Sequence, residues 1–254
     1  MRLALLSDIH ANLHALDACL AHAAAQGVTR FAVLGDVVGY GAFPAEVTQR
    51  VMALAAQGAA VVQGNHDQYA VAPPPALTSL GHISALWTHQ QLGDDERAFL
   101  ATRPLTHHDG ALLLVHASAD APTQWRYVNG PARAARSLHA ARQPPRGDGD
   151  VRYVFGGHVH MQTLYLRGPL GMMLPVALVP GTPVAVPDHR QWIGTVGSVG
   201  QPRDGNCDAM YTVLDEAARQ LTFHRVPYDV QAAADAIRAT PLPAFFADRL
   251  ITGE

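Results

Sequence analysis

The chain has 254 residues, of which 48% are hydrophobic and 15% are charged, and its formal net charge is −3. This composition is typical of a globular α/β protein and gives no sign of a large nucleic-acid-binding surface. All 18 cationic side chains are arginines, which excludes Schiff-base chemistry on lysine and the lysine-dependent P-loop and kinase sites.

Short apolar runs in the first two thirds of the chain are predicted to be strands. They cover residues 3–8, 31–36, 59–65, 111–116 and 151–157. Near-continuous apolar runs are typical of strands that are covered on both faces. The first run is much too short for a signal sequence or a membrane span, so we expect a cytoplasmic protein with no membrane partner.

Helical patterns separate these strands, and the first three strands alternate with two helices. Helices are predicted at 13–26, 44–57, 77–92, 94–102 and 130–141, followed by a polar surface loop at 142–150. The last third of the chain predicts strands at 162–167, 172–179, 209–215 and 220–226, and helices at 230–239 and 242–250. We expect one α/β domain that spans residues 1–254.

Polar side chains follow the apolar runs at their carboxyl ends, where open α/β sheets bind ligands. They are Asp8, His10, Asp36, Asn65, His66, His116, His158 and His160. Oxygen and nitrogen ligands without thiolate suit Mn, Fe, Co, Ni or Zn better than Mg or Ca. Their number exceeds the need of one tetrahedral zinc, so we expect two divalent transition metal ions that share a bridging carboxylate.

Each motif also has a structural explanation when it is taken alone. Asp8 could cap the following helix, and His116 could be a hydrogen-bonded core histidine. The stretch GNHD at 64–67 is harder to explain in this way, because a glycine turn that exposes an amide, an imidazole and a carboxylate has little structural purpose. The succession of such motifs at strand ends favours a metal site.

The series D-x-H at 8–10, GDxxG at 35–39, GNHD at 64–67, a later His and GHxH at 157–160 resembles the calcineurin-like metallophosphoesterase superfamily. The stretches SDIHANLHALDA, GDVVGYG and GSVGQPRDG resemble its bacterial and archaeal YfcE-like phosphodiesterase branch. The resemblance covers nearly the whole chain. It implies a four-layer α/β/β/α sandwich with mixed sheets and a dinuclear metal site on one edge.

The resemblance also implies a role for each site residue. One metal would be held by Asp8, His10, Asp36 and His160, and the other by Asp36, Asn65, His116 and His158. Asp36 would bridge the two ions. His66 resembles the catalytic imidazole of the family, and Asp67 the partner that orients it and fixes its tautomer.

The function expected from this site is hydrolysis of phosphodiester bonds in small nucleotides or other small organic phosphates. Two metals ~3.5–4 Å apart can clamp the attacking and leaving oxygens, and a bridging hydroxide would attack phosphorus. His66 would either stabilise the equatorial oxygens or protonate the leaving group. The alternatives are a phosphomonoesterase or protein Ser/Thr phosphatase, which would use the same site chemistry, and a non-catalytic binding scaffold, which the presence of His66 disfavours. The sequence leaves the substrate, the metal and the oligomeric state open.

Some residues depart from the family pattern or lie beside it. Ala11 replaces a common glycine, and we expect little effect from it. The late loop at 195–205 has TVGS where the branch commonly has NPGS, which leaves its role open. Arg203 is expected either to form a turn with Asp204 or to contact the substrate. Asn12 and Tyr40 are expected either to pack behind the ligands or to reach the phosphate.

Overall fold

Two six-stranded sheets form the centre of the computed structural model, which describes residues 1–143 and 150–254. In order across the sheet, the first consists of β3 (Ala60–Val61), β2 (Arg30–Val33), β1 (Arg2–Leu6), β11 (Ala209–Asp215), β12 (Gln220–Val226) and β9 (Pro183–Ala185). The second consists of β4 (Thr106–Asp109), β5 (Leu112–Val115), β6 (Tyr153–Gly156), β10 (Trp192–Val196), β7 (Gln162–Arg167) and β8 (Met173–Pro175). Both sheets are mixed, since β1 pairs with β2 in parallel and with β11 antiparallel, and β10 does the same with β6 and β7.

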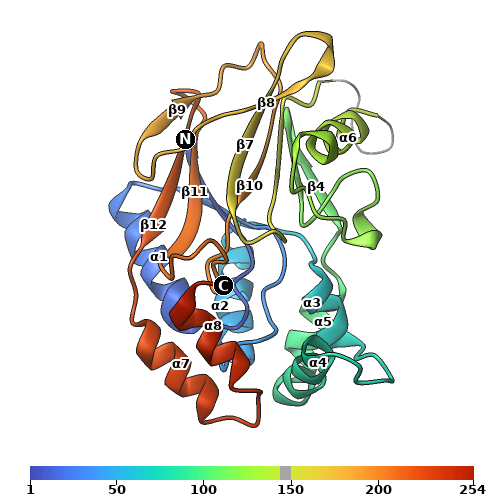
Figure 1. The fold of residues 1–254 in the computed structure, drawn as a ribbon, viewed down its shortest axis with the longest axis vertical. Coiled ribbons are helices and arrows are strands. Elements are labelled where there is room, and N and C mark those ends of the chain that lie inside the picture. Colours follow the sequence, from blue (N-terminus) through green and yellow to red (C-terminus); the bar gives the residue numbers. More distant parts are fainter. Residues whose placement is uncertain (144–149) are drawn as a thin grey trace.

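Helices cover the outer faces of the two sheets (Figure 1). The first sheet packs against α1 (Leu13–Ala25) and α2 (Pro44–Ala56), and the second against α6 (Pro131–Ala141). A third apolar cluster fills the space between the sheets and includes Leu5, Leu114, Phe155 and Phe223. The layers therefore follow the order α/β/β/α, as the family resemblance implied.

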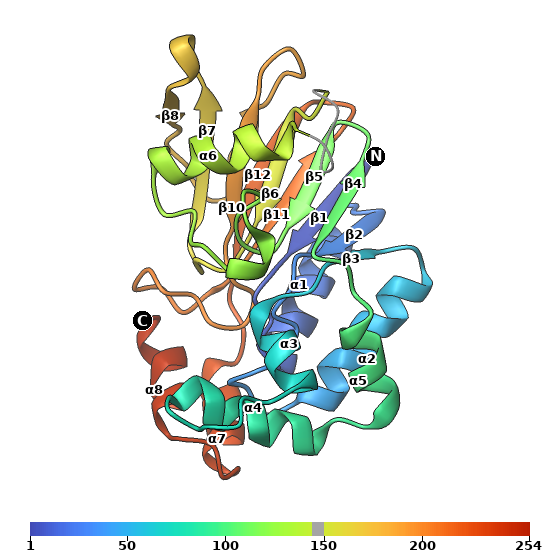
Figure 2. The same cartoon turned by 90° about the vertical axis from the view of Figure 1, so that its right-hand side faces the viewer.

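The remaining helices gather at one end of the sheets (Figure 2). They are α3 (Asn65–Val71), α4 (Leu80–Gln91), α5 (Asp94–Ala101), α7 (Val230–Arg238) and α8 (Phe245–Thr252), and two 3-10 turns lie at Pro122–Gln124 and Pro169–Gly171. None of the helices in the described ranges is long and apolar enough to cross a membrane.

The strand β1 shows why its sequence is apolar throughout. Leu3 and Leu5 point into the cluster between the sheets, whereas Ala4 and Leu6 pack against the helices of the outer layer. Successive side chains of a strand point to opposite faces, so a strand that is covered on both sides needs an unbroken apolar run.

Most of the predicted elements are confirmed. The strands β7, β11 and β12 have the predicted bounds, and α1, α2, α5, α6 and α7 agree within one residue at each end. The strands β4 and β9 were not predicted, β8 is shorter than expected, and α8 begins three residues later. Most of the predicted surface loop at 142–150 lies outside the described residues.

Two errors concern the elements next to the site. The buried strand β10 was not predicted, because Gly194 lies at its centre. A Cβ at this glycine would lie 2.5 Å from the main-chain oxygen of Thr163, so the close approach of the neighbouring strand requires glycine.

The second error is α3, which begins at Asn65 inside the expected turn, with Gly64 as its N-cap and Asp67 as the capping carboxylate.

Candidate metal centre

The carboxyl ends of parallel strands from both sheets meet at one site. The loops after β1 and β2 are joined by hydrogen bonds from the N–H of Asp8 to the oxygen of Gly35 (3.1 Å) and from the N–H of His10 to that of Asp36 (3.0 Å). In the other sheet, the N–H of Gly157 donates to the oxygen of His116 at 2.8 Å. Strand ends thus carry all the motif residues to the same edge of the fold, where none is more than 8% exposed.

Two groups of three side chains have the geometry to hold a metal ion. They are Asp8, His10 and His160, and Asp36, His116 and His158; within each group the ligand atoms lie within 4.8 Å of one another. Asp36 lies between the groups, since its Oδ2 is 3.2 Å from Nε2 of His116 and 3.8 Å from Nε2 of His10. This carboxylate is therefore placed to contact an ion in either group.

Main-chain carbonyls orient the imidazoles. The Nδ1 atoms of His10 and His160 lie 3.1 and 2.6 Å from the oxygens of Val38 and Gln201, and Nδ1 of His116 lies 2.7 Å from a third carbonyl. A carbonyl only accepts, so each Nδ1 carries a proton, and in the neutral ring each Nε2 presents a lone pair. Nε2 of His10 and Nε2 of His160 are 3.1 Å apart, so two lone pairs face each other. A cation between them would relieve this repulsion, and the donor set fits a borderline divalent metal.

Asn65 and His66 approach this site from the first turn of α3. Oδ1 of Asn65 is buried and accepts no hydrogen bond from the described part of the chain. A buried oxygen without a partner is costly, and coordination to a cation would satisfy it. The N–H of His66 donates to Oδ1 of Asp36 at 2.8 Å, which places the start of the helix directly over the shared carboxylate.

Two motif glycines permit these contacts. A Cβ at Gly64 would lie 2.2 Å from Oδ1 of Asp36, and a Cβ at Gly157 would lie 2.2 Å from Oδ2 of Asp8. Any side chain at these positions would push a carboxylate out of place. The glycines of GNHD and GHxH therefore bring the backbone close to the ligands.

The backbone at the site is strained. Non-glycine residues with positive φ, between 49° and 66°, include Asp8, His10, Ala11, Asp36, Tyr40, His158 and His160. Each such residue costs on the order of 1–3 kcal/mol, and such strain clusters at functional sites. Alanine at position 11, with φ of 51°, therefore has a real cost in place of the small effect expected from the sequence.

Burial and neighbouring charges shift the pKa values at the site. Burial alone would raise the pKa of Asp8, but the charge and hydrogen bond of His160 hold it below its usual range. For Asp36, the charges of His116 and His66 outweigh burial in the same way and keep the pKa low. Burial lowers the pKa of His66 and that of His158 to about 4. Both carboxyls are therefore ionised and both of these histidines neutral at pH 7, as metal binding requires. At His116 the charge of Asp36 and the hydrogen bond to it outweigh burial and raise the pKa to about 9, so a metal ion there would displace a proton.

Asp67 contacts other groups than the sequence led us to expect. Its carboxylate accepts hydrogen bonds from the N–H groups of Val37 (2.8 Å), Val38 (3.3 Å) and Gly64 (2.9 Å), and none from the ring of His66. Nδ1 of His66 is buried without a partner among the described residues. Burial and the charge of Asp36 raise the pKa of Asp67 to about 7. Asp67 thus holds the loop after β2 against the start of α3, and can position His66 only through the backbone.

The histidine pKa values predict how the stability of metal-free protein depends on pH. His66, His158 and His224 have pKa values near 4 in the folded chain, below the ordinary 6.5, so the unfolded chain binds protons first as the pH falls. Their contribution is complete above pH ~6.5 and is lost as the pH falls toward 4. The pKa of His10 is also lowered, by burial and the charge of His160, and acts in the same direction. The pKa values of Asp67 and His116 are raised, to about 7 and about 9, and act in the opposite direction, which leaves four groups against two. We expect the free energy of unfolding to drop by a few kcal/mol between pH 7 and pH 4.5.

Urea unfolding of metal-stripped protein at the two pH values measures this drop. His224 lies in β12, stacked on Tyr211 and outside both metal groups, so H224Q serves as a control that should make the drop smaller. Equal stability at the two pH values would contradict the assignment of neutral, buried histidines.

The late loop and its neighbours position the ligands. The hydroxyl of Ser198 donates to the oxygen of Asp8 at 2.8 Å, and Gln201 supplies the carbonyl that orients His160. Asn12 is structural, because its Oδ1 caps α1 and its Nδ2 donates to the oxygen of Gly200 at 2.9 Å. The loop between β10 and β11 therefore fixes the loop after β1 and the last motif histidine.

The expected pair of Arg203 and Asp204 does not form. Asp204 pairs with Arg225 instead, and Nη2 of Arg203 donates to the side-chain oxygen of Gln201 at 2.8 Å. The guanidinium of Arg203 lies 5.9 Å from the ring centre of Tyr40. Of the two roles left open for Arg203, the turn held by a pair with Asp204 is therefore wrong.

Sequence reasoning missed two aromatic residues that border the site. The ring of Tyr127 stacks on His158 with centroids 4.2 Å apart and is 48% exposed, and Trp125 lies edge-on to His116 at 5.9 Å. Both lie in the irregular segment before α6, where no periodicity or motif marks them.

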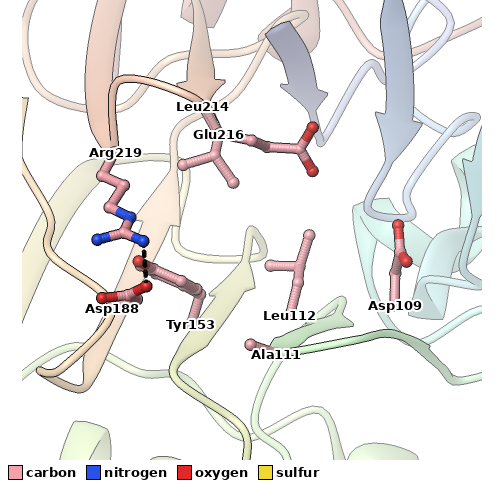
Figure 3. A pocket seen from close by; sticks show the side chains of 8 residues that line it. All are labelled: Asp109, Ala111, Leu112, Tyr153, Asp188, Leu214, Glu216 and Arg219. Atoms are coloured by element: carbon pink, nitrogen blue, oxygen red, sulfur yellow. Dashed lines mark ion pairs between the residues drawn. The ribbon is translucent and has the colours of Figure 1, made fainter. Parts of the chain in front are cut away.

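A separate cavity of about 260 Å³ lies at the opposite end of the sheets (Figure 3). Leu112 and Tyr153 line it from the amino ends of β5 and β6. Its Arg219 is paired with Asp188 at 2.6 Å, and no histidine lines the cavity. No group of metal ligands among the described residues lies in this cavity, so the motif site remains the candidate functional site.

Comparison with known proteins places the chain in a family. The calcineurin-like phosphoesterase superfamily domain matches residues 1–219. An uncharacterised protein of Methanocaldococcus jannaschii is 31% identical over 261 residues, which cover 99% of this chain and 98% of that protein. The symmetrical bis(5'-nucleosyl)-tetraphosphatase of Methylococcus capsulatus is 32% identical over 107 residues, 41% of this chain and 37% of that protein.

A solved structure agrees over the full length. The crystal structure of a metallophosphoesterase from Sphaerobacter thermophilus superimposes with a TM-score of 0.85 and 32% identity, and the alignment covers 100% of both chains. The resemblance to the superfamily that was inferred from the motifs is confirmed. The chain therefore belongs to the calcineurin-like phosphoesterase superfamily, a family of metal-dependent hydrolases that act on phosphoesters.

Proposed function

We propose that the protein hydrolyses phosphodiester bonds of small nucleotides or similar organic phosphates with two divalent transition metal ions. The observation that carries this proposal is the position of Asp36 between two buried groups of ligands. The proposed ligands are Asp8, His10, Asp36 and His160 for one ion, and Asp36, Asn65, His116 and His158 for the other.

Two bound cations would supply Lewis-acid charge for the phosphoryl oxygens and an activated water. The protein groups act around them. Asp36 and Asp8 offset part of the cationic charge, while the histidines and Asn65 are neutral ligands. The pKa of His66 is lowered to about 4 by burial, so its ring is neutral at pH 7. We therefore favour a role for His66 as a hydrogen-bond donor to the equatorial oxygens over proton transfer to the leaving group.

Charge and relatives support a diester as substrate. A diester has one negative charge at phosphorus and a fully ionised monoester has two, and no lysine is available to hold the additional charge. The relative from Methylococcus capsulatus is named for its action on a bis(5'-nucleosyl) tetraphosphate, a small nucleotide. The exposed ring of Tyr127 beside His158 offers a stacking surface for a nucleobase or an aryl group.

Arg203 favours the alternative, a phosphomonoesterase. It lies over Tyr40, whose ring centre is 4.3 Å from that of His66, and could hold the second charge of a monoester. The two functions differ in a measurable ratio, so they can be separated directly.

The test compares kcat/KM for bis-p-nitrophenyl phosphate and p-nitrophenyl phosphate. The protein is first stripped of metal and then loaded separately with Mn, Ni, Zn or Mg, and both substrates are assayed at one pH. We expect the diester to be cleaved faster. A monoester preference of about tenfold, equivalent to ~1.4 kcal/mol in the transition state, would establish the alternative function.

A further inference from the structure

Two arginines on one side of the metal centre have no acidic side chain as a partner among the described residues. Neither Arg203 nor Arg249 forms an ion pair with an acidic side chain within residues 1–143 and 150–254. Nε of Arg203 is buried without a hydrogen-bond partner in the same part of the chain. Nε of Arg249 donates to the oxygen of the last residue, Glu254, and the described residues offer its two Nη atoms no hydrogen-bond partner. Both guanidinium groups therefore keep donors that a bound anion could satisfy.

Arg203 lies at the rim of the metal centre. Its backbone N–H donates to the oxygen of the ligand His160 at 3.2 Å, and its guanidinium lies over Tyr40. The ring centre of Tyr40 is 4.5 Å from that of His10 and 4.3 Å from that of His66. The ring of Tyr40 thus lies between the guanidinium of Arg203 and the imidazoles of His10 and His66.

Arg249 reaches the same rim from α8. The end of this helix is joined to the late loop by a hydrogen bond from the N–H of Gly205 to the oxygen of Gly253 (2.9 Å). The guanidinium of Arg249 lies over Phe245 at 5.2 Å. Burial and the positive charge of Arg203 both lower the pKa of Arg249, and the acidic Glu254 only partly offsets them. The late loop and the end of α8, which this hydrogen bond joins, thus each present one cation on the same side of the metal centre, where a bound anion would offset both charges.

We propose that Arg203 and Arg249 form a subsite for a second, non-reacting phosphate of the substrate. The inference rests on the proposed function, because it places a second phosphate next to the phosphoester that is cleaved. The planar, forked guanidinium groups suit phosphate oxygens, and their charge does not depend on pH in the physiological range. The subsite would select nucleotides with two phosphates over those with one.

The test uses a matched pair of diesters with the same reacting group. They are thymidine 3'-(p-nitrophenyl phosphate) with and without a 5'-phosphate, assayed on metal-loaded wild-type protein and on R203Q and R249Q. The wild type is expected to prefer the 5'-phosphorylated diester by roughly tenfold in kcat/KM, and each variant to lose most of this preference. The control R190Q removes an exposed arginine next to the start of β10, at the far end of the sheets, and should keep the preference.

Binding provides a second readout that does not depend on turnover. Calorimetry on the same proteins compares thymidine 3',5'-bisphosphate with thymidine 3'-monophosphate, and the bisphosphate is expected to bind roughly tenfold more tightly to the wild type only.

If neither diester is cleaved but this difference in binding persists, the proposed reaction fails and the subsite stands. Equal cleavage and equal binding of the two members of each pair would overturn the subsite. An equal loss on both diesters in R203Q and R249Q would also overturn it, since the arginines would then act on the reacting phosphate.

Discussion

Replacement of Asp36 by asparagine is expected to remove most of the bound metal and to lower kcat/KM by about 10³-fold, a loss of ~4 kcal/mol in the transition state. Oδ2 of Asp36 is the only carboxylate oxygen described within 4 Å of imidazoles in both ligand groups. Asparagine keeps the shape of the side chain but lacks the charge that offsets two cations. Metal content by mass spectrometry and hydrolysis of bis-p-nitrophenyl phosphate measure the two effects.

The control for this variant is D17N. Asp17 is on the exposed side of α1, where it pairs with Arg50 at 3.2 Å, and its charge has no part in the site. D17N should bind two ions per chain, as we expect for the wild type. If D36N also bound two ions with unchanged affinity, Asp36 would not be shared between them.

Replacement of His66 by alanine is expected to lower kcat by about 10²–10⁴-fold while the metal content stays that of the wild type. The ring of His66 lies 5.1 Å from that of His10, yet it belongs to neither ligand group. Its loss should therefore affect the reaction and spare the metals. The matched control is H139A, which removes an exposed imidazole from α6.

Leaving groups distinguish the two possible roles of His66. A donor to the equatorial oxygens is needed equally for good and poor leaving groups, so H66A should slow aryl and alkyl diesters by similar factors. A general acid matters most when the leaving group is a poor one. A much larger loss on alkyl diesters would therefore assign proton transfer to His66, and a loss of metal from H66A would remove its separate role.

The sequence was sufficient to predict that the motif residues lie together at one edge of the sheets. Each of them follows a short apolar run that is typical of a buried strand. Asp8, Asp36 and His116 each come within three residues of a strand end. The pairing of parallel strands then carries these positions to one edge. Local pattern and topology agree here, so no detailed packing information was needed.

The remaining features depend on contacts between distant segments. Gly194 looks like a strand breaker until Thr163 of the neighbouring strand is placed beside it. Asp67 was assigned to His66 from the resemblance to the family, whereas its carboxylate contacts the N–H groups of Val37 and Val38 in the preceding loop. Arg249 has no motif at all, and only the packing of α8 on the late loop brings it near the site.

The two ligand groups have a mechanical consequence, because each takes residues from both sheets. Asp8 and His10 follow a strand of the first sheet, whereas His160 follows a strand of the second; the other group is divided in the same way. Each bound ion would therefore be a cross-link between the sheets, and at a free concentration of 100 times Kd it would stabilise the folded state by about 2.7 kcal/mol.

The apolar side chains packed between the sheets then set the distances between ligands from the two sheets. A substitution at Phe155 or Phe223 that let one sheet slide by ~1 Å could cost about 10²-fold in rate while the fold persists. A small shift of one sheet relative to the other would thus change the catalytic rate more than it changes the melting temperature.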